Sequence, residues 1–349
     1  MPPGAEPAGA PEESSAQSAQ AQTRTTAAAA AQKMAQQEAE DAAETEANAV
    51  AADKVPRKPY PAYKVPLAGK GLMLDVARAG DHLVAVGAHG DIVTSTDGIH
   101  WTQSQSPVRE LLTAVTFVDA DNGWAVGHDS VIIHSADGGK TWALQSFQPQ
   151  LQSPLLNVSF LDPQHGFAVG AFGQLRGTTD GGARWHDVDA DNIRSAGLNF
   201  YDMIKLGDGS LLIVGEQGTL NLSTDQGATW QKLDSPYQGS FFGALPSGPK
   251  GALVYGLRGN AYITDDVGTG LWKQVPTHVT TSFFGGSRLK DGSFVLVGAH
   301  GAIMQISADG NTVKSLTGPS DQYLDAVLPQ GSGLVLAGLS GMQLQKSMH

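Results

Sequence analysis

The hydrophobic positions of this chain fall into short runs that recur at a nearly constant interval. Seven times an apolar run of strand length, such as residues 83–87, leads into Gly-x-x-Gly or a close variant. Short apolar runs bounded by glycine turns predict buried β-strands. The seven turns lie at residues 87–90, 127–130, 170–173, 215–218, 256–259, 298–301 and 338–341.

The spacing of these turns predicts the fold. Successive first glycines are 40, 43, 45, 41, 42 and 40 residues apart. This is the length of four short strands with their turns, which make one blade of a β-propeller. The chain is therefore predicted to be an all-β, seven-bladed propeller. In the third repeat, the four strands are expected at residues 155–162, 166–170, 174–178 and 184–188.

A second motif, Ser/Thr-x-Asp-x-Gly-x-x-Trp, follows each of the first four turns. An Asp at this place can accept hydrogen bonds from nearby backbone N–H groups, Gly supplies a positive φ, and Trp packs between neighbouring sheets. We therefore interpret the motif as structural, in preference to a catalytic or calcium-binding role. Its residues are Ser95, Asp97 and Trp101, then Ser135, Asp137 and Trp142, then Asp180 and Trp185, and finally Asp225 and Trp230.

These motifs are Asp boxes, also called bacterial neuraminidase repeats. Together with the Gly-Trp-Ala-Val-Gly phrase at residues 123–127, they resemble the photosystem II stability and assembly factor family. Residues 74–78 and 83–87 are similar to its bacterial, non-photosynthetic branch, and the resemblance runs from about Tyr60 to the C-terminus. It implies a non-catalytic accessory or assembly factor for a membrane protein complex or a transporter, on the exported side of a membrane. No binding residue is carried over from the family.

Composition divides the chain into a tail and a domain. Residues 1–54 contain no Phe, Tyr, Trp, Leu or Ile, so they cannot bury enough apolar surface to fold alone. We expect residues 1–58 to be a disordered or transiently helical tail and linker, and residues 59–349 to be the propeller. After residue 339 only one more strand fits. Residues 63–67 are therefore predicted to supply the outer strand of blade seven and to close the ring.

Charge and hydropathy argue against nucleic-acid binding and against a transmembrane segment. The net charge is −12, and residues 1–53 hold nine acidic side chains against two basic ones, so the domain is only mildly acidic. With no basic stripe to neutralise phosphates, nucleic-acid binding is not expected. The chain contains no apolar run of about eighteen residues, so no transmembrane segment is predicted. A secretory signal needs a basic start and an apolar stretch, and the first residues provide neither, so the sequence as written predicts a cytoplasmic location. The resemblance instead implies a periplasmic or otherwise exported protein, and this is the location we favour.

One face of the disc is predicted to bind protein. The glycine turns share that face with the connections between blades, whereas the Asp boxes lie on the opposite face. Aromatic residues and Arg are enriched at protein interfaces. The candidate interface residues are His89, Arg109, Glu110, Arg194, Tyr237, Arg258, His300 and Tyr323. Phe242 and Phe284 are expected to pack between inner strands at the central channel.

A carbohydrate-binding or glycoside-hydrolysing propeller is the alternative, because sialidases use the same boxes. A retaining sialidase needs an arginine clamp and a Glu base, yet the domain has few arginines and its only Glu residues are Glu110 and Glu216. A glycosidase that uses two carboxylates among Asp75, Asp202 and Asp325 is an open alternative. We favour a hydrogen-bonding role for these residues around the channel.

No metal or cofactor is expected. His89 and His300 occupy equivalent turns of the first and sixth repeats, too far apart to share a metal ion. We therefore predict a protein-binding scaffold that is not an enzyme, acts as a monomer, and has a membrane protein complex or transporter subunit as partner.

Overall fold

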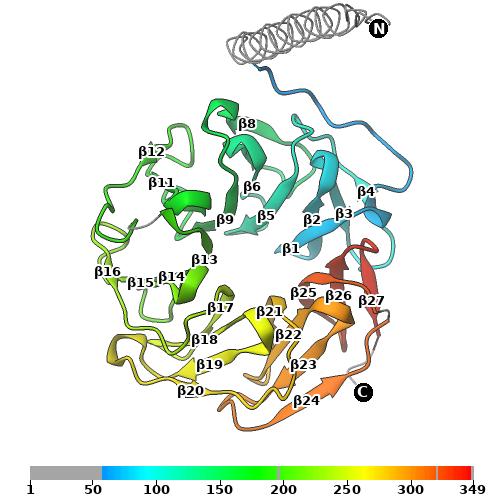
Figure 1. Ribbon diagram of the computed structural model, residues 1–349. Helices are drawn as coiled ribbons and strands as arrows, with labels where there is room; N and C mark the ends of the chain where they lie inside the picture. The colour runs from blue at the N-terminus through cyan, green and yellow to red at the C-terminus, as the bar shows by residue number, and fades with distance from the viewer. Residues whose placement is uncertain (1–56, 195–196, 320, 347–349) are drawn as a thin grey trace, which may run out of the picture. The chain divides into compact units, whose positions relative to one another are not determined.

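The computed structural model describes residues 57–194, 197–319 and 321–346. Residues 1–56 of the predicted tail and linker, which spans residues 1–58, lie outside the described residues. Residues Pro59–His349 form one compact unit. Its sheets stand around a central axis as the blades of a seven-bladed propeller (Figure 1), which confirms the predicted fold. No helix of the described ranges is long and apolar enough to cross a membrane.

Each blade is an antiparallel sheet whose strands follow one another outward from the axis. The bounds are β1 (Met73–Ala79), β2 (His82–Gly87), β3 (Ile92–Ser95), β4 (Thr102–Gln103); β5 (Leu112–Phe117), β6 (Gly123–Gly127), β7 (Ile132–Ser135), β8 (Ala143–Ser146); β9 (Leu155–Phe160), β10 (Gly166–Gly170), β11 (Leu175–Thr178), β12 (His186–Asp187); β13 (Phe200–Lys205), β14 (Leu211–Gly215), β15 (Leu220–Ser223), β16 (Gln231–Lys232); β17 (Phe241–Ser247), β18 (Gly251–Gly256), β19 (Ala261–Thr264), β20 (Lys273–Gln274); β21 (Phe283–Arg288), β22 (Phe294–Gly298), β23 (Ile303–Ile306), β24 (Val313–Leu316); β25 (Leu324–Gln330), β26 (Gly333–Gly338) and β27 (Gln343–Gln345).

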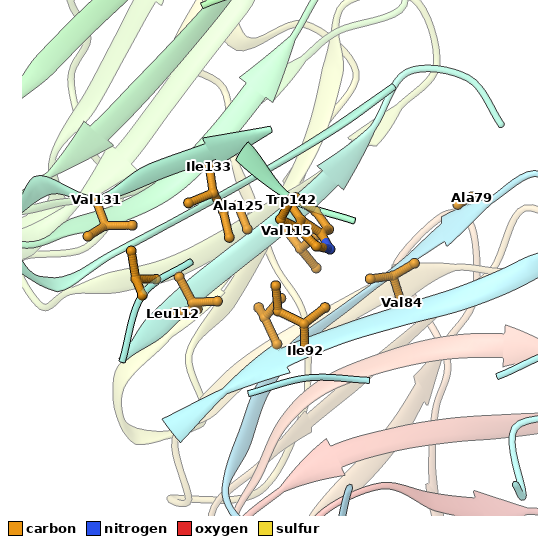
Figure 2. Packing of buried hydrophobic residues seen from close by; sticks show 11 residues of the cluster. Ala79, Val84, Ile92, Leu112, Val115, Ala125, Val131, Ile133 and Trp142 are labelled. Carbon is orange, nitrogen blue, oxygen red and sulfur yellow. The ribbon is translucent and has the colours of Figure 1, made fainter. Parts of the chain in front are cut away.

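The hydrophobic core lies between blades rather than at the axis. Every residue of β6, β10, β14 and β22 is buried, because these second strands are covered by a neighbouring blade on both faces. Between blades one and two, Val84 and Ile92 pack against Val115 and Ile133, with Trp142 beside them (Figure 2). Burial on both faces explains why the sequence reads as short continuous apolar runs.

The first glycine of each turn lies against the start of the inner strand of its own blade. A Cβ atom at Gly127 would stand 2.0 Å from the carbonyl oxygen of Leu111, the residue before β5. At the equivalent glycines of all seven blades this distance is 2.0 to 2.3 Å, far below any real contact. The next backbone N–H, that of His128 in blade two, donates to the same oxygen at 2.9 Å. The glycine repeat is therefore required by a close backbone approach.

The Ser/Thr-x-Asp motifs form turns at the opposite ends of the blades. In blade two, Asp137 accepts hydrogen bonds from the backbone N–H of Thr141 at 2.9 Å and from its hydroxyl at 2.6 Å. The Ser135 hydroxyl donates to Asp137 at 2.8 Å and accepts from the N–H of Gly139. Trp142 donates its indole N–H to the Gly139 carbonyl. These bonds occupy the carboxylate with its own turn.

The other three copies keep most of this geometry. Asp97 and Asp225 accept from backbone N–H groups of their own turns, as does Asp180, which bonds the N–H of Arg184 at 2.9 Å. Trp101 and Trp230 donate to the glycine carbonyl within the turn. The exception is Trp185, whose indole N–H donates to the side chain of Gln145 in the preceding blade, at 3.2 Å.

The ring closes differently from the sequence prediction. Blade seven has three strands in the described part of the chain, and residues 63–67 form no strand. Pro66 lies within the predicted strand and has no N–H to donate to a ladder. Residues 62–65 run beside blade one instead, where Val65 donates to Gln103 of β4 at 2.8 Å and Gln103 donates to the Tyr63 carbonyl at 2.9 Å.

Packing between the first and last blades replaces the missing strand. Met73, Val76 and Leu83 of blade one share a buried cluster with Ala326 and Val335 of blade seven. The short helix η1 (Ala68–Lys70) adds to this contact, because Met342 donates its N–H to the Gly69 carbonyl at 2.9 Å. The ring is closed by apolar contact, by this backbone bond and by side-chain bonds such as that from the Arg78 guanidinium to the Pro329 carbonyl at 2.8 Å.

Replacing Gly127 with Ala tests the close approach. The added methyl meets the Leu111 carbonyl, so we expect Gly127→Ala to lower the free energy of unfolding by about 1–3 kcal/mol. Gly71→Ala is the control, because a Cβ there would lie 3.6 Å from its nearest atom and φ is −80°. Urea denaturation measures both. Equal stability of the two variants would contradict the steric argument.

Replacing Asp137 with Ala tests the box turn. Loss of the carboxylate leaves the N–H of Thr141 and the hydroxyl of Ser135 without their partner, so thermal denaturation should show a loss of about 1–2 kcal/mol. Asp265→Ala is the matched control, because Asp265 is exposed in the corresponding turn of blade five. A loss of the same size in both variants would contradict a specific role for Asp137.

Candidate functional site

A cavity lies at the centre of the propeller, and its lining includes the residues at the start of each inner strand, on the side of the glycine turns. Its volume is about 330 Å³, and the inner strands of all seven blades line it. Each inner strand begins with a buried residue that pairs with the first glycine of the turn, and the register then shifts by one residue. This β-bulge directs side chains to the channel. The residues that follow the buried start are Leu74, Thr113, Leu156, Tyr201, Phe242, Phe284 and Asp325, and all of them line the cavity.

Aromatic rings form a continuous arc around one half of the cavity mouth. We name Tyr201, Phe242, Phe284 and Tyr323 the aromatic arc. Ring centroids are 5.2 Å apart between Tyr201 and Phe242, 5.6 Å between Phe242 and Phe284, and 6.0 Å between Phe284 and Tyr323. The arc runs from blade four to the connection that enters blade seven. Phe242 and Phe284 line the channel as predicted, whereas Phe241 and Phe283 are the fully buried members of each pair.

Two carboxylates in the cavity tie neighbouring blades together. Asp75 of β1 accepts hydrogen bonds at 2.8 Å from the N–H groups of Val76 and of Val115 in blade two. Asp202 of β13 accepts from Ala244 in blade five at 2.9 Å. Burial raises the pKa of each carboxyl to about 6, and the backbone bonds oppose that rise. Both residues make the hydrogen bonds around the channel that the sequence favours.

A third carboxylate, Asp325, has a different environment. Among the described residues no group lies within hydrogen-bonding distance of its side chain, and burial raises its pKa to about 6. The same cavity holds a buried side-chain oxygen of Asn157 without a partner. The described residues that line the cavity include no Lys, Arg or His. The cavity is therefore acidic and carries no positive side chain.

Three of the candidate interface residues are used within the fold. The Arg109 guanidinium lies 4.1 Å from the ring centre of Tyr63 and donates to the Pro61 carbonyl at 2.9 Å. Arg194 donates to the carbonyl oxygens of Gly173, Leu175 and Val188 in blade three. Tyr237 packs against Phe241 and Tyr262 at the boundary of blades four and five. These contacts hold connecting segments against the blades.

The other five candidates lie on the turn face. Glu110 accepts a hydrogen bond from the N–H of Arg109. His89, Arg258 and His300 are exposed at turn tips with φ of 55° to 57°. His300 lies 5.8 Å from Tyr323, so the structure brings these two together at one end of the aromatic arc. His89 and Arg258 belong to the separate turns of blades one and five.

Sequence reasoning missed Tyr201 and the order of the arc. A sequence signal for Tyr201 did exist. In each blade the residue that lines the channel comes directly after the buried residue that pairs with the first glycine of the turn, as Tyr201 comes after Phe200. In the described ranges no three His, Asp or Glu side chains lie close enough to hold a metal ion.

The sequence matches a known family. The sequence model of the family described as Photosynthesis system II assembly factor YCF48 covers residues 93–151 and 145–317. No curated protein is detectably similar in sequence.

Solved structures share the fold at low identity. "YCF48 bound to D1 peptide" has a TM-score of 0.66 and is 17% identical, covering 84% of this chain and 99% of that one. "YCF48 from Cyanidioschyzon merolae" has a TM-score of 0.65 at 17% identity, covering 81% and 97%. The WD40 β-propeller domain of Doa1 reaches 0.63 at 14% identity, covering 79% and 93%. Structural likeness at this level of identity shows the fold alone.

Replacing Asp325 with Asn tests the buried carboxylate. Its pKa is raised on folding to about 6, so the charged form destabilises the folded state and stability falls as pH rises from about 4 to 6. We expect Asp325→Asn to be more stable than wild type by about 1–2 kcal/mol at about pH 7, with no difference near pH 4. Denaturation at both pH values measures this. Asp265→Asn on the opposite face is the control, and a gain that does not vary with pH would contradict the assignment.

Proposed function

The chain belongs to the photosynthesis system II assembly factor YCF48 family, and we propose that it is a non-catalytic scaffold that binds a segment of a membrane protein, as an accessory or assembly factor for a membrane complex or transporter. The observation that carries the proposal is the aromatic arc at the mouth of the central cavity. Aromatic side chains in a partly buried patch are typical of the energetic centre of a protein interface.

Exposed apolar residues extend this surface beyond the cavity. Tyr323 is 46% exposed, and Leu339 in the turn of blade seven is 50% exposed. The two are adjacent, because the Leu339 N–H donates to the Tyr323 carbonyl at 3.1 Å. Loops held on rigid strands are suited to recognition, because little order is lost on binding.

The family relationship indicates the kind of partner. A structurally similar protein is described as YCF48 bound to a D1 peptide, so a peptide segment is an occupant that this fold can take. We extend this to a segment of a membrane protein for the present chain. We also propose that the protein works on the exported side of the membrane, and its release by osmotic shock of the source cells tests that location.

A glycan ligand is the second candidate. The aromatic arc favours it, because aromatic faces at a channel mouth could also stack on sugar rings. A glycosidase is less consistent with the site, because Asp75 and Asp202 are occupied by backbone N–H groups of the next blade. A glycan array would identify a sugar ligand directly.

Affinity capture from detergent-solubilised membranes tests the proposed function. The wild-type chain should retain a membrane protein, identified by mass spectrometry, that the Tyr323→Ser, Leu339→Ser double variant loses by about tenfold or more. Leu271→Ser is the matched control, because Leu271 is 77% exposed in a turn of the opposite face. Equal capture by the double variant and wild type would place the binding surface elsewhere and remove the support for this face.

A further inference from the structure

We propose that the cavity mouth receives a basic side chain, Lys or Arg, of the partner polypeptide, held between the aromatic arc and the carboxylate of Asp325. This inference rests on the proposed function and names the chemistry that the partner must present.

The cavity has an unbalanced negative charge. Asp75, Asp202 and Asp325 all line it, and its described lining residues include no cation. Asp75 and Asp202 are partly compensated by backbone N–H groups, whereas no described group lies within hydrogen-bonding distance of Asp325. Asp325 is only half-buried, and a partly desolvated carboxylate without a hydrogen-bond partner is unfavourable, so an entering cation gains this interaction without first displacing another partner.

The walls of the cavity also favour a cation. Aromatic faces carry a negative quadrupole that attracts ammonium and guanidinium groups within about 6 Å of the ring centre. Tyr201, Phe242 and Phe284 line one side of the cavity, and Tyr323 extends this row of rings because it stacks on Phe284 with 22° between the ring planes. The opposite side is formed by Leu74, Thr113 and Leu156, so neither side repels a positive group.

The size and spacing of the site point to a side chain rather than a metal ion. In the part of the chain that the structure describes, no three carboxylates or imidazoles lie close enough to share a metal ion. A volume of about 330 Å³ is at the lower end of the range for small-ligand pockets. It accommodates one long side chain, such as Lys or Arg, together with water.

The surface around the mouth points to a polypeptide as the source of that side chain. Leu339 is 50% exposed at the turn of blade seven and lies beside the aromatic arc, because its N–H donates to the Tyr323 carbonyl at 3.1 Å. A free amine would leave this apolar side chain uncovered. Apolar residues that flank Lys or Arg in a peptide would cover Leu339 while the basic side chain enters the cavity.

Calorimetric titration of the full-length chain with two peptides tests the inference. The probes are acetylated, amidated Ala-Leu-Arg-Leu-Ala and its counterpart with Gln in place of Arg. We expect the Arg peptide to bind about tenfold more tightly than the Gln peptide. Asp325→Asn should remove this preference, and Asp265→Asn on the opposite face should keep it. Because Asp325→Asn is expected to be the more stable protein, unfolding would not explain a loss of binding.

Two substitutions at Tyr323 separate a cation–π contact from simple apolar contact. Tyr323→Phe keeps the ring and should preserve the preference for Arg, whereas Tyr323→Leu keeps apolar volume and should reduce it about threefold or more. Equal binding of the Arg and Gln peptides to wild type, or no binding of either up to about 5 mM, would overturn the inference.

The affinity capture distinguishes failure of this inference from failure of the proposed function. If the Tyr323→Ser, Leu339→Ser variant loses the membrane protein while Asp325→Asn retains it, the face binds a partner but not through a basic side chain. If both lose it and Asp265→Asn retains it, both proposals are supported.

Discussion

The close approach of one glycine to one carbonyl oxygen in each blade is the constraint on which the rest of this structure depends. At all seven positions a Cβ atom would lie within 2.3 Å of the carbonyl that precedes the inner strand. In each blade the backbone N–H of the residue after this glycine donates a hydrogen bond to the same carbonyl oxygen. In blade two, for example, the N–H of His128 donates to the carbonyl oxygen of Leu111. This contact joins the turn to the entrance of the inner strand, and the register shift beside it sets how the inner strand faces the axis.

The candidate site is a consequence of that register shift. In each blade the residue after the buried start is directed to the channel, so a single structural rule places Tyr201, Phe242 and Phe284 around one mouth. Asp75 and Asp202 follow one position later and bond to the backbone of the next blade. The same ring of positions therefore serves both the cohesion of the propeller and the chemistry of its cavity.

The two faces of the disc differ in the polar and apolar groups that they leave free. On one face the carboxylates of Asp97, Asp137, Asp180 and Asp225 are satisfied within their own turns, which leaves little capacity for a ligand. On the other face an acidic cavity is bordered by aromatic and aliphatic side chains that remain partly exposed. Functional residues are often carried by loops that a rigid scaffold positions, and the turn face of this propeller has that arrangement.

The spacing of glycines and the apolar runs predicted the number of blades, the boundaries of the third blade to within two residues and the placement of turns and boxes on opposite faces. These features are predictable because glycine spacing and apolar runs reflect local backbone geometry. The contacts of Arg109 and Arg194 emerge only in the folded chain, because their partners are the ring of Tyr63 and carbonyl oxygens that carry no sequence signal. The same is true of the ring closure and the aromatic arc, because both depend on how blades distant in sequence are placed around the axis.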